Sequence, residues 1–268
     1  MRYTPFDLQF LSLVVTDGRP EAAAELLRTW RDDQDRVEPW FDDERVLRRL
    51  MADDRAVIEL SPRFLFTVLL RRIRRDLAEI PYTVERVDAT GRVVVFDARL
   101  AHELLRASEM FNYLVELLVS FERTETVTVQ EQAARRVRRL STMSIDDMLE
   151  LADLVDPPLR PMVFRRIGDI ALFTTGLFPD AVLRGPRLPL VASLEPSRVR
   201  RRRRLEDYEE EGRRFYRMAA DRLSASHPML SQVLTRLADE FTAARKPLNV
   251  LSERYVSWAR PHWHQIPS

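Results

Sequence analysis

Residues 160–179, RPMVFRRIGDIALFTTGLFP, constrain the fold more than any other part of the chain. This is the most apolar long stretch, it holds two of the six glycines, and prolines bracket it. Its apolar residues are not confined to one stripe, which is typical of a helix that is buried on all sides. The sequence therefore predicts a buried central helix over 160–178.

Small residues along this stretch predict which helix packs against it. Gly168, Leu172 and Gly176 form one line at i, i+4 and i+8. Because glycine has no side chain, a second backbone can approach closely at both ends of that line. Gly212 and Ala219, in a helix predicted over about 206–224, are the natural complement. We predict a tight helix crossing with Gly168, Gly176 and Gly212 at the contact.

One acid, Asp169, lies within the apolar stretch, with Arg165 and Arg166 at i−4 and i−3. An unpaired buried carboxylate is costly, so we expect a partner among Arg165, Arg166, Arg213 and Tyr216. Two interpretations stay open: a sealed buried polar cluster, or a small ligand pocket between helices. The residues considered for either are Asp169, Arg165, Arg166, Tyr208 and Tyr216, with Thr174 and Thr175 as further pocket residues.

Hydrophobic periodicity elsewhere predicts a mostly α fold, a multi-helix bundle with one β-hairpin at about 82–97 around Gly91. Apolar residues at alternating spacings of three and four predict one long helix over 97–121. Residues 122–130 are interpreted as a polar connection, and residues 130–141 as a basic amphipathic helix. The other predicted helices cover 6–16 (helix or strand), 20–32, 42–53, 62–79, 145–155 and 229–246, and Pro247 is expected to kink or break the last one.

Prolines and arginines suggest a division of the chain. Residues 179–198 contain four prolines and Gly185 and show little periodicity, so we interpret 181–204 as a loop or linker. The predicted units are residues 1–180, with the hairpin, and residues 205–268, which pack on the central helix. A single domain overall is the alternative.

Composition excludes several classes of site. The chain of 268 residues has no cysteine, which rules out disulfides, thiolate metal sites and a cysteine nucleophile. Its net charge of +1 gives no overall attraction to nucleic acid or membrane. No long uncharged apolar run and no signal-peptide pattern are evident, so we expect a cytoplasmic protein without membrane contact. Phosphate-binding and nucleophile motifs are absent, and we expect no cofactor.

Clustered arginines are the main argument for nucleic-acid binding. The possible contact residues are Arg198, Arg200, Arg201, Arg202, Arg203 and Arg204. Acids follow at once between 206 and 211, so local ion pairing is the alternative. Residues 1–60 carry 9 basic and 14 acidic side chains, whereas residues 198–268 carry 15 and 9. That asymmetry also suits packing of the termini or self-association.

A second basic cluster, RRIRR at 71–75, lies in the predicted helix 62–79. Two helices and a hairpin in this order could form a winged helix, with Arg71, Arg72, Arg74 and Arg75 as readers. Residues 64–70, FLFTVLL, are however too apolar for the half of a helix that enters a groove. A core helix with a basic solvent face is the other interpretation.

Only Lys246 among the 43 basic residues is a lysine. A genome that favours arginine codons explains this, and a Schiff-base amine is the functional alternative. Metal signals are weak: His102, Glu109 and Glu116 share a helix face without a Glu-x-x-His motif, and His262 and His264 lie in the tail. We expect no metal site.

Three functions remain open from the sequence. The first is a non-catalytic interaction or regulatory module with a protein partner or a second copy, because no catalytic constellation is present. The second is an Arg-rich nucleic-acid-binding protein. The third is a helical enzyme or small-ligand binder with a pocket near Asp169.

Overall fold

The computed structural model describes residues 2–86, 91–122, 126–131, 136–184 and 203–256. Its fold is mostly α, as predicted. The first half of the chain contains α1 Pro5–Val15, α2 Pro20–Asp32, η1 Gln34–Asp42, α3 Glu44–Ala52, α4 Asp54–Glu59, α5 Pro62–Glu79, β1 Thr83–Arg86, β2 Arg92–Val95, α6 Ala98–Arg106 and α7 Ser108–Ser120. The second half contains β3 Thr126–Glu131, β4 Arg136–Ser141, α8 Ile145–Leu154, η2 Pro157–Leu159, α9 Arg160–Leu177, α10 Pro179–Arg184, α11 Leu205–Leu223, α12 Pro228–Asp239, α13 Phe241–Leu251 and η3 Ser252–Val256.

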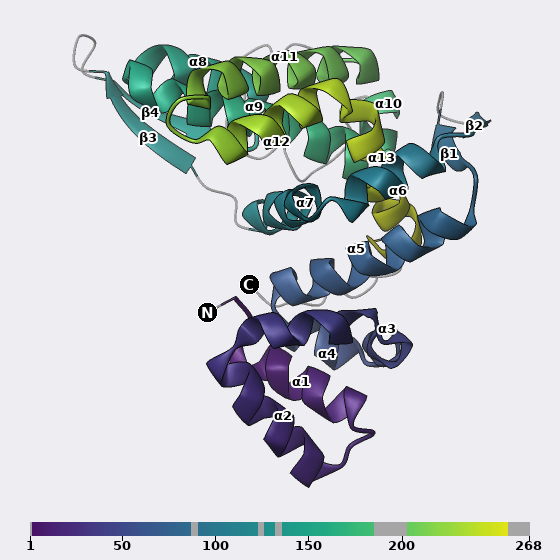
Figure 1. The fold of residues 1–268 in the computed structure, drawn as a ribbon. Helices are drawn as coiled ribbons and strands as arrows, with labels where there is room; N and C mark the ends of the chain where they lie inside the picture. Colours follow the sequence, from purple (N-terminus) through teal and green to yellow (C-terminus); the bar gives the residue numbers. More distant parts are fainter. Residues whose placement is uncertain (1, 87–90, 123–125, 132–135, 185–202, 257–268) are drawn as a thin grey trace.

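Helix α5 joins two apolar cores (Figure 1). Ser61 caps it and Pro62 occupies its first turn, which is why its start was predictable from sequence. Phe64 and Val68 pack in the smaller core with the N-terminal helices α1–α4. Ile73 and Leu77 pack in the larger core with the rest of the chain. The predicted division into 1–180 and 205–268 stays a prediction; the apolar packing divides within α5.

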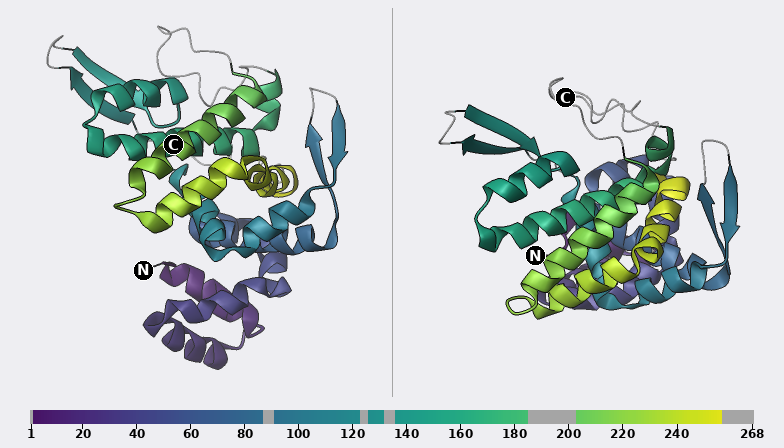
Figure 2. Two further views of the ribbon diagram at one scale, coloured as in Figure 1. Left: turned by 45° about the horizontal axis from the view of Figure 1, so that its top comes forward. Right: turned by 90° about the horizontal axis from the view of Figure 1, so that it is seen from above.

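The predicted central helix is α9, which packs against α8, α11 and α13 (Figure 2). A Cβ on Gly168 would stand 2.6 Å from the Tyr216 ring of α11. A Cβ on Gly212 of α11 would overlap Phe241 and touch Ala171 of α9. Gly176 instead faces Leu248 of α13. The glycines thus serve two contacts of α9, with α11 and with α13.

The helix predicted over 130–141 is wrong, because the described residues of this range belong to a second hairpin, β3–β4. The strands pair antiparallel, with Val127 opposite Leu140, and both residues pack on the larger core. The alternation Thr126, Val127, Thr128, Val129 is the strand signal, because β-branched residues fit a pleated strand. Interpreting it as a connection led to the wrong element. The two hairpins project from opposite ends of the helical body (Figure 1).

The boundaries of two other predicted helices also differ from the structure. The helix expected over 97–121 is two helices, because Ala107 adopts an extended conformation (φ −71°, ψ 116°) between α6 and α7. Leu104 on α6 and Leu114 on α7 are both buried in the larger core. Between α12 and α13 the chain breaks at Glu240, whereas Pro247 lies inside α13. Burial of Leu248 and Leu251 offsets the hydrogen bond that Pro247 cannot donate.

Candidate functional site

Asp169 lies at the centre of a buried polar cluster that joins α7, α9 and α11. The hydroxyls of Tyr113 and Tyr216 both donate to its Oδ1, at 2.6 and 2.8 Å. Arg165 Nε lies 3.6 Å from Oδ2 and donates to the Tyr113 hydroxyl at 3.1 Å. Only 4% of Asp169 is exposed. The geometry is that of a sealed cluster, because tyrosines and its own arginine neighbour cover the carboxylate.

The other residues predicted for this cluster lie elsewhere. Arg166 donates to the Thr142 carbonyl and to Ser120 Oγ, and it stacks over the Phe121 ring. Thr175 bonds back to the Ala171 carbonyl within its own helix. Tyr208 lies near Arg203, close to Asp146 and Glu211. Tyr113 was missed from the sequence, although it is the one hydroxyl-bearing residue within 110–118.

The cluster predicts how stability depends on alkaline pH. Burial, and then the neighbouring Asp169 charge, raise the pKa values of Tyr113 and Tyr216 well above the ordinary value of 10.0. The protonated tyrosines are therefore favoured in the folded state. Their contribution to stability is complete below the unfolded-state pKa and is lost as pH rises above it towards the folded-state values.

We expect the free energy of unfolding to fall progressively as pH rises above about 10, the ordinary tyrosine pKa. Denaturant melts across this range measure that slope. The Tyr113→Phe variant should show a shallower slope, because it cannot ionise in the unfolded state. Equal slopes for the variant and the wild type would contradict the assignment.

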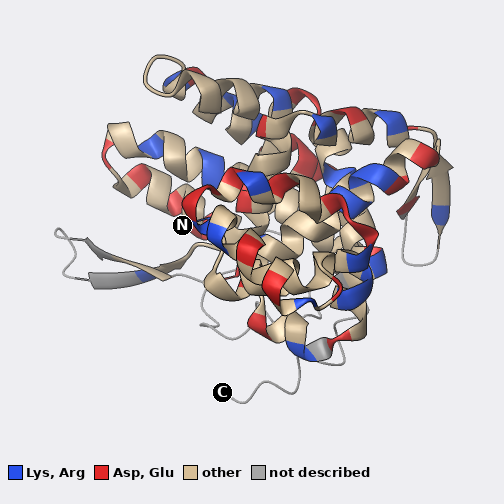
Figure 3. Cartoon of the chain, turned by 60° about the horizontal axis from the view of Figure 1, so that its bottom comes forward, with Lys and Arg blue, Asp and Glu red and all other residues tan. Residues whose placement is uncertain are grey.

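The basic cluster of α5 is bound to the acidic residues of η1. Arg71 pairs with Glu38 and with Asp42, the latter at 2.6 Å, and its guanidinium stacks on Phe41 and Phe111. Arg75 donates to the Asp42 carbonyl. Two further members also meet acids, Arg72 with Asp76 and Arg74 with Asp42. Acidic and basic residues are interleaved over the helices (Figure 3). This contact joins α5 to η1.

Replacing Arg71 with methionine should lower the free energy of unfolding by about 2 kcal/mol, because two carboxylates lose a nearly buried partner while the side-chain stem is kept. Chemical denaturation measures the change. Arg99→Met is the matched control, since Arg99 forms an exposed pair with Glu103. We expect the control to be indistinguishable from wild type. Equal losses in both variants would contradict a special role for Arg71.

The arginine run is only partly described. Arg198, Arg200, Arg201 and Arg202 lie outside the described residues, as do His262 and His264 of the tail. Arg203 is almost buried and bridges Asp146 and Glu211, with 2.6 Å to each. Arg204 is exposed at the start of α11, where its backbone N–H donates to Asp207. Arg203 thus links α11 to α8 through acids other than its i+4 neighbour Asp207.

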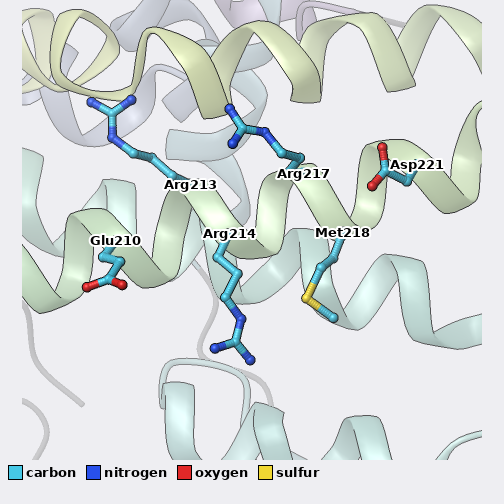
Figure 4. Close-up of a pocket in the computed structure, with 6 residues that line it drawn as sticks. All are labelled: Glu210, Arg213, Arg214, Arg217, Met218 and Asp221. Carbon is cyan, nitrogen blue, oxygen red and sulfur yellow. The ribbon is translucent and has the colours of Figure 1, made fainter.

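A surface hollow of about 420 Å³ lies along α11. Its lining residues are Glu210, Arg213, Arg214, Arg217, Met218 and Asp221 (Figure 4). Arg213 and Arg217 extend towards α12 and α13, and Arg214 points the other way (Figure 4). Arg213 donates hydrogen bonds to the carbonyl oxygens of Ala238 and Asp239, and Arg217 forms an ion pair with Asp239. These two arginines hold helices together.

The residues next to Lys246 in the sequence did not indicate the buried ion pairs that it forms. It lies inside α13 and is 1% exposed. Its Nζ is 2.8 Å from Asp97 Oδ2, pairs with Glu85, and donates to Thr83 Oγ1 at 3.2 Å. Beside it lies a cleft of about 220 Å³ between β1 and the end of α13. Tyr82 and Val84 border this cleft on one side, and Asn249 and Val250 on the other.

The hairpin β1–β2 exposes several of its apolar residues. Its register pairs Val84 with Val94 and Thr83 with Val95, so Tyr82, Val84, Val94 and Phe96 share one face. Tyr82, Val94 and Phe96 are 42%, 49% and 79% exposed. Thr83, Glu85 and Asp97 occupy the opposite face, towards α13. Val93, which is 49% exposed, and Val95 share this second face, so both faces of the hairpin combine apolar and polar residues.

Other candidate sites and the comparisons add little. Within the described residues, no three His, Asp or Glu side chains are grouped so as to hold a metal ion. Among the described helices, none is long and apolar enough to cross a bilayer. No protein family, curated protein or solved structure matches the chain. The exposed face of β1–β2 and the buried Lys246 cluster behind it are therefore the features on which we build.

Proposed function

We propose that this protein is a non-catalytic interaction module that associates through the hairpin β1–β2. The exposed apolar side chains of this hairpin carry the proposal. In water an amphipathic ribbon gains most by burying its apolar face, yet this one exposes Tyr82, Val94 and Phe96. Tyr82 and Phe96 already contact edge to face, with centroids 6.2 Å apart, which makes the apolar face continuous. A protein surface that covers this face supplies the missing burial.

The edges of the hairpin suggest how that surface joins it. In the described part of the chain each strand of this sheet has one neighbour, so β2 presents backbone N–H and C=O groups on its outer side. β1 lies towards α13, where the cleft begins, and β2 lies on the outer side (Figure 1). An edge strand of this kind is extended by a further strand in many protein complexes.

We commit to a second copy of the chain as the partner, because β2 is complementary to itself. A twofold axis through Val94 would pair the two β2 strands antiparallel. Val94 would then face Val94 of the second copy, and Arg92 would lie opposite its Phe96. A guanidinium beside an aromatic ring is favourable, and the two Arg92 side chains stay apart. On that face of the four-stranded sheet, the two Val94 side chains would lie between two Arg92–Phe96 pairs.

Sedimentation equilibrium tests this proposal. The wild type should form dimers, and Phe96→Ser should sediment as a monomer because it removes the most exposed aromatic of the interface. Met229→Ser is the matched control, since Met229 is also 79% exposed but lies on α12, away from the hairpin. It should dimerise like the wild type. A monomeric wild type at about 100 µM, where even weak specific dimers are populated, would overturn the proposal.

A further inference from the structure

The hairpin β1–β2 is fastened to the helical body by charges. None of its described residues between 82 and 96 belongs to either apolar core. Its inner face instead offers Glu85 and, at its end, Asp97 to two consecutive cations of α13, Arg245 and Lys246. Next to these contacts, where a core hairpin would be packed, lies the 220 Å³ cleft.

Lys246 is the centre of this attachment. An ammonium group has three N–H donors. Its three partners, Thr83, Glu85 and Asp97, all come from the hairpin or its two ends, although they are more than 140 residues away in sequence. Thr83 also donates to Asp97, which ties the two ends of the hairpin together. Arg245 adds a second link, from Glu85 at 2.8 Å to Glu209 of α11 at 3.2 Å.

We propose that β1–β2 is a detachable arm and that Lys246 is its latch. Releasing the arm returns Lys246, Glu85 and Asp97 to water, where each charge is solvated, and it exposes no core side chain of the hairpin. The ion pairs therefore hold the arm against α13. Because the arm shares no apolar core with the helical body, it can open without unfolding of the body. Elements that carry little buried apolar surface open locally at lower free energy than the whole fold. This inference does not depend on what binds the outer face.

The single lysine makes the latch directly measurable. An acetyl N-hydroxysuccinimide ester acylates a free amine: the Nζ lone pair attacks the ester carbonyl, N-hydroxysuccinimide leaves, and the ammonium proton is lost to water. Lys246 is the one lysine of the chain, so peptide mapping reads its acylation without competition from other side-chain amines. The acetylated amine is neutral and cannot close the latch again.

We expect the acylation rate of Lys246 to be about 10-fold or more above the rate that global unfolding allows. This rate should depend only weakly on urea concentration, because local opening of the hairpin exposes little surface. Hydrogen exchange of buried α9 amides gives the global rate in the same sample. Glu85→Gln and Asp97→Asn should each accelerate acylation several-fold while leaving α9 exchange unchanged. Glu103→Gln, which removes an exposed acid on α6, is the matched control and should acylate at the wild-type rate.

Acylation that follows α9 exchange at every urea concentration would overturn the latch, since Lys246 would then be reached only by unfolding of the whole chain. Equal acceleration in the Glu85, Asp97 and Glu103 variants would overturn it as well. The wild-type measurement does not depend on whether any variant folds. A low protein concentration keeps the chain monomeric, so failure of the latch is distinguishable from failure of the dimer.

Discussion

Replacing Asp169 with alanine should lower the free energy of unfolding by about 3–5 kcal/mol, the usual cost of breaking a buried charged network. The substitution leaves the hydroxyls of Tyr113 and Tyr216 buried without their acceptor, and Arg165 loses its carboxylate. Each unsatisfied buried group costs about 1–3 kcal/mol. Urea or guanidinium denaturation measures the loss.

Asp169→Asn is the graded companion of that variant. The asparagine Oδ1 can still accept from both tyrosines, whereas Nδ2 replaces the carboxylate oxygen opposite Arg165 with a neutral N–H donor. We expect a loss of about 1–2 kcal/mol, less than half that of alanine. Burial raises the pKa of Asp169, and Arg165 and the two hydroxyls offset part of that rise. Equal losses in the alanine and asparagine variants would contradict the role assigned to the two hydroxyls.

Replacing Gly212 with alanine should lower the free energy of unfolding by about 1–3 kcal/mol, even though alanine favours a helix over glycine by about 1 kcal/mol. The added Cβ overlaps the Phe241 ring and touches Ala171, and neither can move freely in the core. Thermal or denaturant unfolding measures the change. A stabilised variant would show that α9 and α11 do not cross closely at this glycine.

A double-mutant cycle locates the overlap. Phe241→Leu makes room beside Gly212 at its own cost in lost packing. In its presence, Gly212→Ala should cost clearly less than in the wild type, with a coupling of about 1 kcal/mol. Additive losses in the double variant would place the strain of Gly212→Ala away from Phe241.

Local signals made much of the helical fold predictable. Ser61 and Pro62 fixed the start of α5, Gly91 marked the first hairpin, and the apolar run 160–178 predicted α9. These features depend on residues close in sequence. The second hairpin escaped because the basic residues at 135–139 suggested a helix, whereas the decisive alternation lay in residues 126–129, interpreted as a connection.

The candidate site depends on contacts between distant parts of the chain, and these could not be predicted. Lys246 meets Thr83 across 163 residues and Tyr113 meets Asp169 across 56. No periodicity relates such pairs. The sequence also showed only alternation in residues 82–97, which marks two faces but not which one turns inward. The ion pairs of Glu85 with Arg245 and Lys246 decide that, and Tyr82, Val94 and Phe96 stay exposed.

Association through β2 is the central claim, and concentration-dependent hydrogen exchange tests it most directly. We predict that amides of Arg92–Val95 exchange more slowly as protein concentration rises, because the second copy pairs with the outer edge of β2. Amides of Thr83–Arg86, on the strand that borders the cleft, should keep the same rates. Exchange in Arg92–Val95 that does not change with concentration, or that slows equally in both strands, would contradict the account.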